Sequence, residues 1–316
     1  MRRTVAQGTT VTRRRFGELQ ETFSSLRSVI RVDVATVLLQ WAAGGLFFLW
    51  FTTRRREVGV GYGWLLRGTY LLLAVGAAAA GFEFGAVPVR EASSIAVAAA
   101  ALAALVVSGV RRKAGVSGQS AEHDRRSERV AAMTGIDRTV AERPADAASP
   151  GREFPPALDL LAPALAIAGL VAAAVDAGGN LAVSLLRMFA GAAFLGAVTD
   201  AMLLGHWYLV QPGLPRRHLN ELVRALGLVW PAEIISLLLP TGMFSVWSGT
   251  VNDGWGGQLG WFWAACSLAT LVLVFATRAA LRERYYSAVM SATGLLYLAI
   301  LTAFGTDLVA RAILAG

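Results

Sequence analysis

Long runs of uncharged, apolar residues are the feature that most constrains how this chain can fold. Several of them reach the ~20 residues that an α-helix needs to cross the ~30 Å hydrocarbon core of a bilayer. Only 16% of the residues are charged and the mean hydropathy is +0.54, whereas a soluble domain carries about 25% charge. The runs lack the period-2 alternation of transmembrane strands. The sequence therefore predicts an all-α fold, a polytopic transmembrane bundle of about eight spanning helices.

The charged residues gather between these runs and divide the chain into four parts. An Arg-rich N-terminal tail, 1–34, precedes a three-helix transmembrane part, 35–110. A polar loop, 111–156, has no apolar periodicity and leads to a five-helix transmembrane part, 157–316. The expected spans are 35–53, 64–82, 93–110, 157–177, 181–210, 220–247, 259–280 and 285–311.

The distribution of basic residues predicts both the membrane and the orientation. Of the 29 basic residues, 28 are Arg and only Lys113 is Lys, a bias that with the high Ala and Gly content suggests a GC-rich bacterial genome. The loops after the odd-numbered spans hold 17 Lys and Arg, counting Arg278, whereas those after the second, fourth and sixth hold one. By the positive-inside rule, the odd-numbered loops are cytoplasmic, and the protein is expected in a bacterial inner (cytoplasmic) membrane.

The N-terminal tail conflicts with this orientation. Both termini would lie outside, yet the first 34 residues carry seven Arg that would have to be translocated. Three explanations stay open. The tail crosses despite its charge, the first apolar run is re-entrant, or translation begins downstream, at Val11, Val29 or Val34.

Two acids are expected deep in the membrane, where ionisable groups are costly and mark functional sites. Asp200 lies 17 residues before Arg217, and Glu233 lies 16 residues after it. If the fifth and sixth spans form a hairpin, the two carboxyl groups share one depth and can share a proton. Each can instead form a structural hydrogen bond between helices. Pro231 is expected to kink the sixth span beside Glu233.

Polar and aromatic residues at the cytoplasmic end of this hairpin are a second candidate site, the mouth of a pocket for a flat amphipathic molecule such as a quinone. The alternatives are aromatic residues at the membrane interface and an arginine that reaches lipid phosphate. The candidates are His206, Trp207, Tyr208, Gln211, Glu221 and Arg224.

No cofactor is certain from the sequence. Neither His123 nor His218 is placed to join His206 in bis-His haem ligation, although a Met partner stays open. Cys266 is the only cysteine, so disulfides, Cys-ligated zinc and iron–sulfur clusters within the chain are excluded. No metal site is expected.

The other membrane charges are expected to be structural. Arg67 is close enough to a span end to reach the interface. Asp176 and Arg187 can pair across the 178–180 turn, and the i,i+4 spacing of Asp307 and Arg311 allows a pair on one helix.

Three functions are consistent with these features. The first is a membrane subunit of a respiratory or redox assembly that handles quinone or protons through the polar hairpin, with other subunits and the lipid bilayer as partners. The second is a secondary transporter or proton-coupled permease, favoured by the buried acids and by a weak internal repeat. The third is a membrane scaffold or assembly factor without a ligand. No nucleotide-binding loop, HExxH or GxSxG motif is present, so there is no sign of a self-contained enzyme. No basic face for nucleic acid is visible.

Overall fold

The computed structural model describes residues 34–114, 116–118, 152–211, 214–283 and 285–314. In this part of the chain the regular elements are all helices, as the sequence predicts. The hypotheses about the N-terminal tail, and most of the polar loop, lie outside the described residues. The long helices are the first helix, Val34–Thr53, then α2 Val60–Phe84, α3 Pro88–Val110, α5 Leu161–Asp176, α6 Leu181–Val210, α7 Arg217–Leu238, α9 Gln258–Ala280 and α10 Tyr286–Leu314. Short helices are η1 Arg112–Ala114, η2 Pro156–Leu160 and α8 Phe244–Trp247.

Seven of the described helices are long and apolar enough to cross a membrane, among them η2 and α5 taken together. The chain is therefore a multi-pass integral membrane protein. The one remaining expected span, the sixth, corresponds to α7, whose 22 residues reach about 33 Å at ~1.5 Å per residue. It is more polar than the others because it carries Arg217, Glu221, Arg224 and Glu233.

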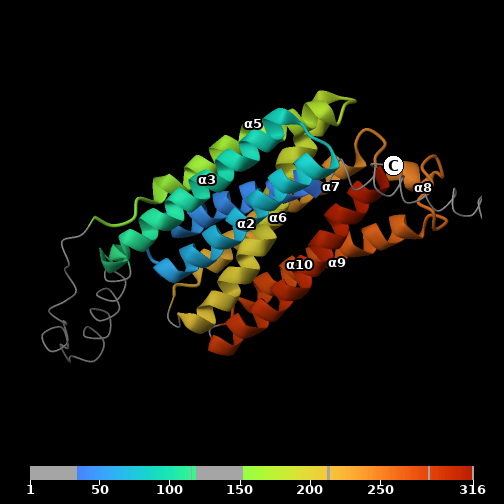
Figure 1. Ribbon diagram of the computed structural model, residues 1–316. Coiled ribbons are helices and arrows are strands. Elements are labelled where there is room, and N and C mark those ends of the chain that lie inside the picture. Colours follow the sequence, from blue (N-terminus) through green and yellow to red (C-terminus); the bar gives the residue numbers. More distant parts are fainter. Residues whose placement is uncertain (1–33, 115, 119–151, 212–213, 284, 315–316) are drawn as a thin grey trace, which may run out of the picture.

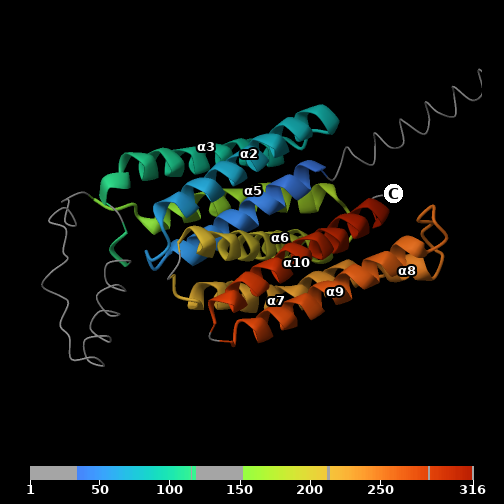
Figure 2. The same ribbon diagram turned by 90° about the horizontal axis from the view of Figure 1, so that it is seen from below.

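The helices lie side by side with their axes roughly along one direction (Figures 1 and 2). α2 packs on α3 and α3 on α5, while α9 packs on α10. α6 joins these groups because it contacts α5, α7 and α10. Figure 2 shows α6 between the α2–α3 side and the α9–α10 side. A polar group on α6 can therefore reach both halves of the bundle.

The bundle buries acidic side chains in its interior and also exposes many large apolar side chains on its surface, unlike a water-soluble protein. Asp200, Glu233 and Asp307 are fully buried, whereas Leu72 and Leu301 are 71% and 69% exposed. This pattern is expected where the surrounding solvent is hydrocarbon.

Glycines allow the first helix to lie directly against α6. A Cβ atom at Gly44 would lie 2.6 Å from the carbonyl carbon of Ala192 and closer still to its oxygen. A Cβ at Gly196 would likewise collide with the backbone of Gly44. Such contacts between small residues drive helix association where there is no hydrophobic effect between helices.

Ion pairs join the loops at one end of the bundle, which is called the Arg-rich end and comprises 54–59, 152–155, 214–217 and 281–283. Arg54 and Arg55 both bind Glu221, at 3.1 and 2.6 Å. Arg56 binds Glu153 at 3.1 Å, and Arg111 donates to the Glu153 carbonyl. These contacts join the loop after the first span to α7 and to the loop after the third span.

Glu57 also belongs to these contacts. Arg217 and His218, at the start of α7, both bind its carboxylate, and the His218 Nε2–Glu57 Oε2 distance is 2.6 Å. Burial raises the pKa of Glu57, but the hydrogen bonds from Arg217 and His218 lower it more, so the pKa lies below its ordinary value of 4.5.

The sixth span departs from its expected length. It was expected over 220–247, but α7 ends at Leu238, and α8 follows after a break at Pro240. Pro240 has no N–H to continue the helix, and the glycine at 242 has φ +36°. Pro231 does not end α7, which stays helical on both sides of it.

Candidate functional site

The two predicted acids lie in different surroundings. Asp200 on α6 accepts a hydrogen bond from the Tyr70 hydroxyl of α2. Gly45 leaves the space for this, because a Cβ there would overlap the Tyr70 ring. Tyr62 donates to the Asp200 backbone carbonyl at 3.5 Å, and Oδ2 of Asp200 has no hydrogen-bond partner among the described residues. Asp200 thus links α6 to α2.

Glu233 on α7 belongs to a different group of charges. The groups that act on it electrostatically are Asp307 and Arg311 of α10 and Arg187 of α6. Arg311 Nε donates to Asp307 Oδ1 at 2.8 Å, which confirms the predicted i,i+4 pair. Within the described ranges no N–H group donates a hydrogen bond to either oxygen of Glu233. These four residues, Arg187, Glu233, Asp307 and Arg311, are called the four-charge cluster.

The structure therefore does not bring Asp200 and Glu233 together. Asp200 interacts with Tyr70 of α2, whereas the charged groups that act on Glu233 belong to α6 and α10. The expectation of a shared proton assumed that the two acids face one another across the α6–α7 hairpin. Instead α7 turns Glu233 towards α10, a helix whose position no local spacing reveals.

Arg187 does not form the predicted pair with Asp176. Its Nε donates to the Ser236 carbonyl at 2.9 Å, and its Nη2 binds the Leu239 carbonyl. Ser236 lies in the last turn of α7 and Leu239 is the C-cap residue, so neither carbonyl accepts a hydrogen bond within the helix. Arg187 therefore fixes the end of α7 against α6 and keeps a charge that no described carboxylate neutralises by hydrogen bonding.

A glycine and a glutamine complete the surroundings of the cluster. A Cβ at Gly191 would lie 3.1 Å from Gln40 Nε2 and 3.4 Å from Asp307 Oδ1, and it would overlap the Arg311 guanidinium. Gln40 of the first helix donates to the Met188 carbonyl at 2.8 Å. The absence of a side chain at Gly191 of α6 lets polar groups of the first helix and of α10 come together beside α6.

A cavity of ≈410 Å³ adjoins this cluster at the end of the bundle opposite the Arg-rich end. It is lined by the 177–180 turn, the first turns of α6, the end of α7 and the end of α10. Arg187 and Arg311 are its only charged lining residues within the described chain. Glu233 and Asp307 are fully buried and do not line it, and Arg311 connects the cavity to Asp307. The end with this cavity is called the cavity end.

The residues predicted to form a mouth at the Arg-rich end do not converge on one site. Trp207 Nε1 donates to Gln211 Oε1 at 3.0 Å, and Gln211 in turn binds the backbone of Glu57 and Gly59. The Tyr208 hydroxyl donates to the Pro215 carbonyl at 2.6 Å. These side chains hold loops in place.

The remaining mouth residues point elsewhere. Glu221 binds Arg54 and Arg55 as described above, and Arg224 is exposed. His206 is exposed and lies next to Tyr297 of α10, with Nδ1 3.4 Å from the hydroxyl. No group of three or more His, Cys, Asp or Glu suited to a metal ion occurs in the described residues.

Two buried ion pairs went unrecognised in the sequence. Arg67 does not reach the interface. It binds Asp159 through two hydrogen bonds of 2.7 Å, and the side chains are 4% and 0% exposed. Arg90 binds its neighbour Glu91 at 2.6 Å inside the bundle. The acid of each pair lies at the start of a helix, Asp159 in η2 and Glu91 in the first turn of α3. The spacing of residues along the sequence does not predict that such a residue pairs inside the bundle.

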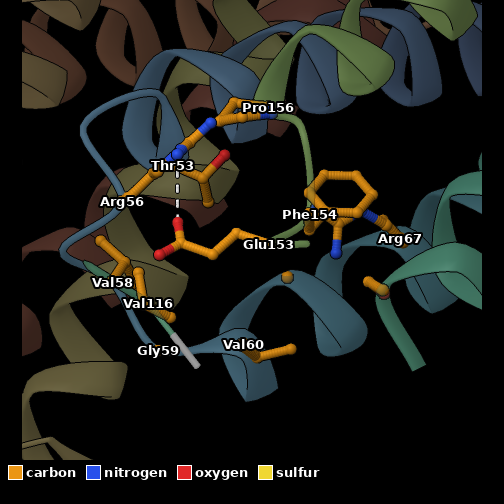
Figure 3. Close-up of a pocket in the computed structure, with 12 residues that line it drawn as sticks. Thr53, Arg56, Val58, Gly59, Val60, Arg67, Val116, Glu153, Phe154 and Pro156 are labelled. Atoms are coloured by element: carbon orange, nitrogen blue, oxygen red, sulfur yellow. Dashed lines mark hydrogen bonds and ion pairs between the residues drawn. The ribbon is translucent and has the colours of Figure 1, made fainter. Parts of the chain in front are cut away.

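Two further cavities are less suited to a polar ligand. One, of ≈50 Å³, lies at the Arg-rich end, where the Arg56–Glu153 pair and the Phe154 ring beside Arg67 enclose it (Figure 3). The other, of ≈420 Å³, lies between the first helix, α5 and α6, and all of its lining residues are apolar or glycine. The first is small, and the second offers no hydrogen-bonding side chain.

Comparison with protein-family models, with curated proteins and with solved structures finds no significant match. The assignment of a function therefore rests on the geometry of the four-charge cluster and its cavity.

Proposed function

We propose that the protein is a secondary transporter or proton-coupled permease whose working site is the four-charge cluster. The observation that carries this proposal is the meeting of two arginines and two acids, from α6, α7 and α10, beside a cavity of ≈410 Å³. Ionisable residues inside a membrane protein mark the pathways of ions, protons and substrates. A cavity of this volume is within the range of sites for small molecules.

The chemistry of Glu233 suits proton exchange. A buried carboxylate without a hydrogen-bond donor is costly to keep ionised, so such a group takes up a proton in place of solvation. Asp307 is close enough to interact with Glu233 electrostatically, so the two acids form one charged group inside the bundle. Arg311 touches both Asp307 and the cavity. A solute that binds in the cavity thereby alters the field on the acid pair, which is the coupling a transporter needs.

α7 has a weak point next to the site. Pro231 lacks an N–H, so the carbonyl four residues earlier, at Gly227, loses its helical hydrogen bond. Glu233 lies two residues beyond. Broken or weakened helices in transporters rearrange around a fixed site, and α7 is suited to such a movement.

The hypothesis of a quinone-handling redox subunit draws less support. A quinone needs donors to its carbonyl oxygens beside an apolar chamber, and the apolar cavity at Gly44 and Phe47 has none in its lining. The polar residues expected to supply them hold loops instead. A scaffold without a ligand would gain nothing from four charges beside a cavity, because buried ion networks add little stability.

In this proposal the Arg-rich end is cytoplasmic and the cavity end faces outwards across a bacterial inner membrane. The Arg content of the loops supports this orientation. The cavity would then open to the outer aqueous phase, where solute is collected.

Proton movement in proteoliposomes tests the proposal. Vesicles containing the purified protein and entrapped pyranine are exposed to gradients of sodium phosphate, succinate, glutamate and chloride. The wild type is expected to change the internal pH with at least one of these salts, faster than protein-free vesicles do. Glu233→Gln is expected to abolish this proton movement, because it removes the titrating group and keeps the shape.

The matched control is Arg278→Gln, an exposed position at the end of α9 and away from the cluster. It is expected to behave like the wild type. Equal proton movement in the wild type and in Glu233→Gln would refute the role of the cluster, and proton movement no faster than in protein-free vesicles for every salt would refute transport.

A further inference from the structure

We propose that the cavity binds a small oxyanion, a carboxylate or phosphate group, between Arg187 and Arg311. This inference rests on the proposed function insofar as it names the substrate class of the same site. Its own evidence is the charge of the lining, which in the described chain is basic at two positions and acidic at none.

Arg187 and Arg311 interact with each other electrostatically. Two guanidinium groups that face the same cavity repel one another, and an anion placed between them relieves the repulsion. Guanidinium groups present forked donors that match the oxygens of carboxylates and phosphates. The pair therefore favours an oxyanion over a cation or a neutral solute.

Arg187 is held in place before any ligand arrives. Its Nε and Nη2 atoms bind the Ser236 and Leu239 carbonyls, and the described residues leave its Nη1 group unused. A side chain fixed in this way loses little conformational entropy when it binds a ligand.

The N-terminus of α6 forms one wall of the cavity. The first turns of α6, whose N-cap is Asn180, supply Val183 and Ser184 to the lining. The positive end of the α6 dipole therefore lies at the cavity. The protonation of Glu233 determines the net charge of the four-charge cluster. When Glu233 is protonated, Arg187, Arg311 and Asp307 leave the cluster with one excess positive charge.

The anion can come from a soluble solute or from a lipid headgroup, because the cavity lies at an end of the bundle. In detergent, the thermal unfolding temperature is measured against sodium phosphate, sodium succinate and, at equal ionic strength, sodium chloride. In nanodiscs, native mass spectrometry compares retention of phosphatidylglycerol with that of phosphatidylcholine. Stabilisation by phosphate or succinate indicates a soluble source, and selective retention of phosphatidylglycerol indicates a headgroup.

Two variants test the site in different ways. Arg187→Lys keeps the charge but loses the fork, and it is expected to weaken anion binding about tenfold, the loss of one charge-assisted hydrogen bond. Val183→Trp fills the cavity without changing any charge and is expected to abolish binding. Arg278→Gln should bind like the wild type. If one variant does not fold, the other still decides.

Anion effects that are unchanged in the folded variants would overturn the inference, as would equal stabilisation by chloride or a wild type that responds in neither arm. Binding at this cavity without any flux would leave the inference standing and refute the transport proposal. Anion flux that is unchanged in both Arg187→Lys and Val183→Trp would refute this inference and leave the transport proposal standing.

Discussion

Replacing Gly44 by alanine tests the close contact between the first helix and α6, on which the position of the site depends. The new Cβ would lie 2.6 Å from the carbonyl carbon of Ala192. Its nearest contact would be the Ala192 carbonyl oxygen, 1.7 Å away. Ordinary contacts of this kind are about 3.4 Å or more, so the two backbones must separate by more than about 1.5 Å. The obstacle is backbone and cannot rotate away.

This separation would break two hydrogen bonds next to the contact. Gln40 Nε2 lies 2.8 Å from the Met188 carbonyl, and Trp41 Nε1 lies 2.9 Å from Thr199 Oγ1. Each lengthens beyond hydrogen-bonding distance and costs about 1 kcal/mol. Overpacking adds about 1–3 kcal/mol. The expected loss is about 4 kcal/mol, which for 316 residues at ~2.1 cal/mol/K per residue lowers the Tm by roughly 6 °C.

The assay is thermal unfolding in detergent, with Gly68→Ala as the control. A Cβ at Gly68 meets no atom within 4 Å, and both variants gain about 1 kcal/mol of helix propensity. The difference between them isolates the contact with α6. Equal unfolding temperatures for the two variants would refute the packing of the first helix on α6.

Two further predictions concern stability. Asp159→Asn leaves Arg67 as a buried charge without its ionic partner and is expected to lower the free energy of unfolding by about 3–5 kcal/mol. The double variant Arg67→Met with Asp159→Leu is expected to recover most of this stability. Thermal unfolding of the single and double variants tests both expectations. The pKa of Glu57 is lowered in the folded protein, so its contribution to stability is present above the ordinary value of 4.5 and is lost as the pH falls through the folded value. Glu57→Gln is therefore expected to flatten the acid limb of a Tm–pH profile, and an unchanged limb would contradict the role of Arg217 and His218.

The sequence predicts the fold well because membrane spans depend on local composition. The α6 helix begins at Leu181 and ends at Val210, the bounds expected from hydropathy and the flanking turns alone. The end of α7 was misplaced because Pro240 breaks a stretch that is apolar on both sides. Hydropathy does not distinguish a helix from a turn of the same composition.

The candidate site was predictable only in part. Burial of Asp200 and Glu233 follows from their positions in apolar runs and is confirmed. Their partners do not follow from local spacing, since Tyr70 lies 130 residues from Asp200 in the chain. The sequence spacing pairs Arg187 with the nearest acid, Asp176, but in the fold Arg187 instead binds the Ser236 and Leu239 carbonyls at the end of α7. Contacts between helices depend on packing that spacing along the chain does not record.

The central claim is that the four-charge cluster couples protons to the movement of an anionic solute. The most direct measurement is uptake of radiolabelled phosphate or succinate into proteoliposomes driven only by a pH gradient, acidic outside. The account predicts that the wild type accumulates the anion above its external concentration, whereas Glu233→Gln at most equilibrates it. Accumulation by Glu233→Gln equal to that of the wild type would contradict the account.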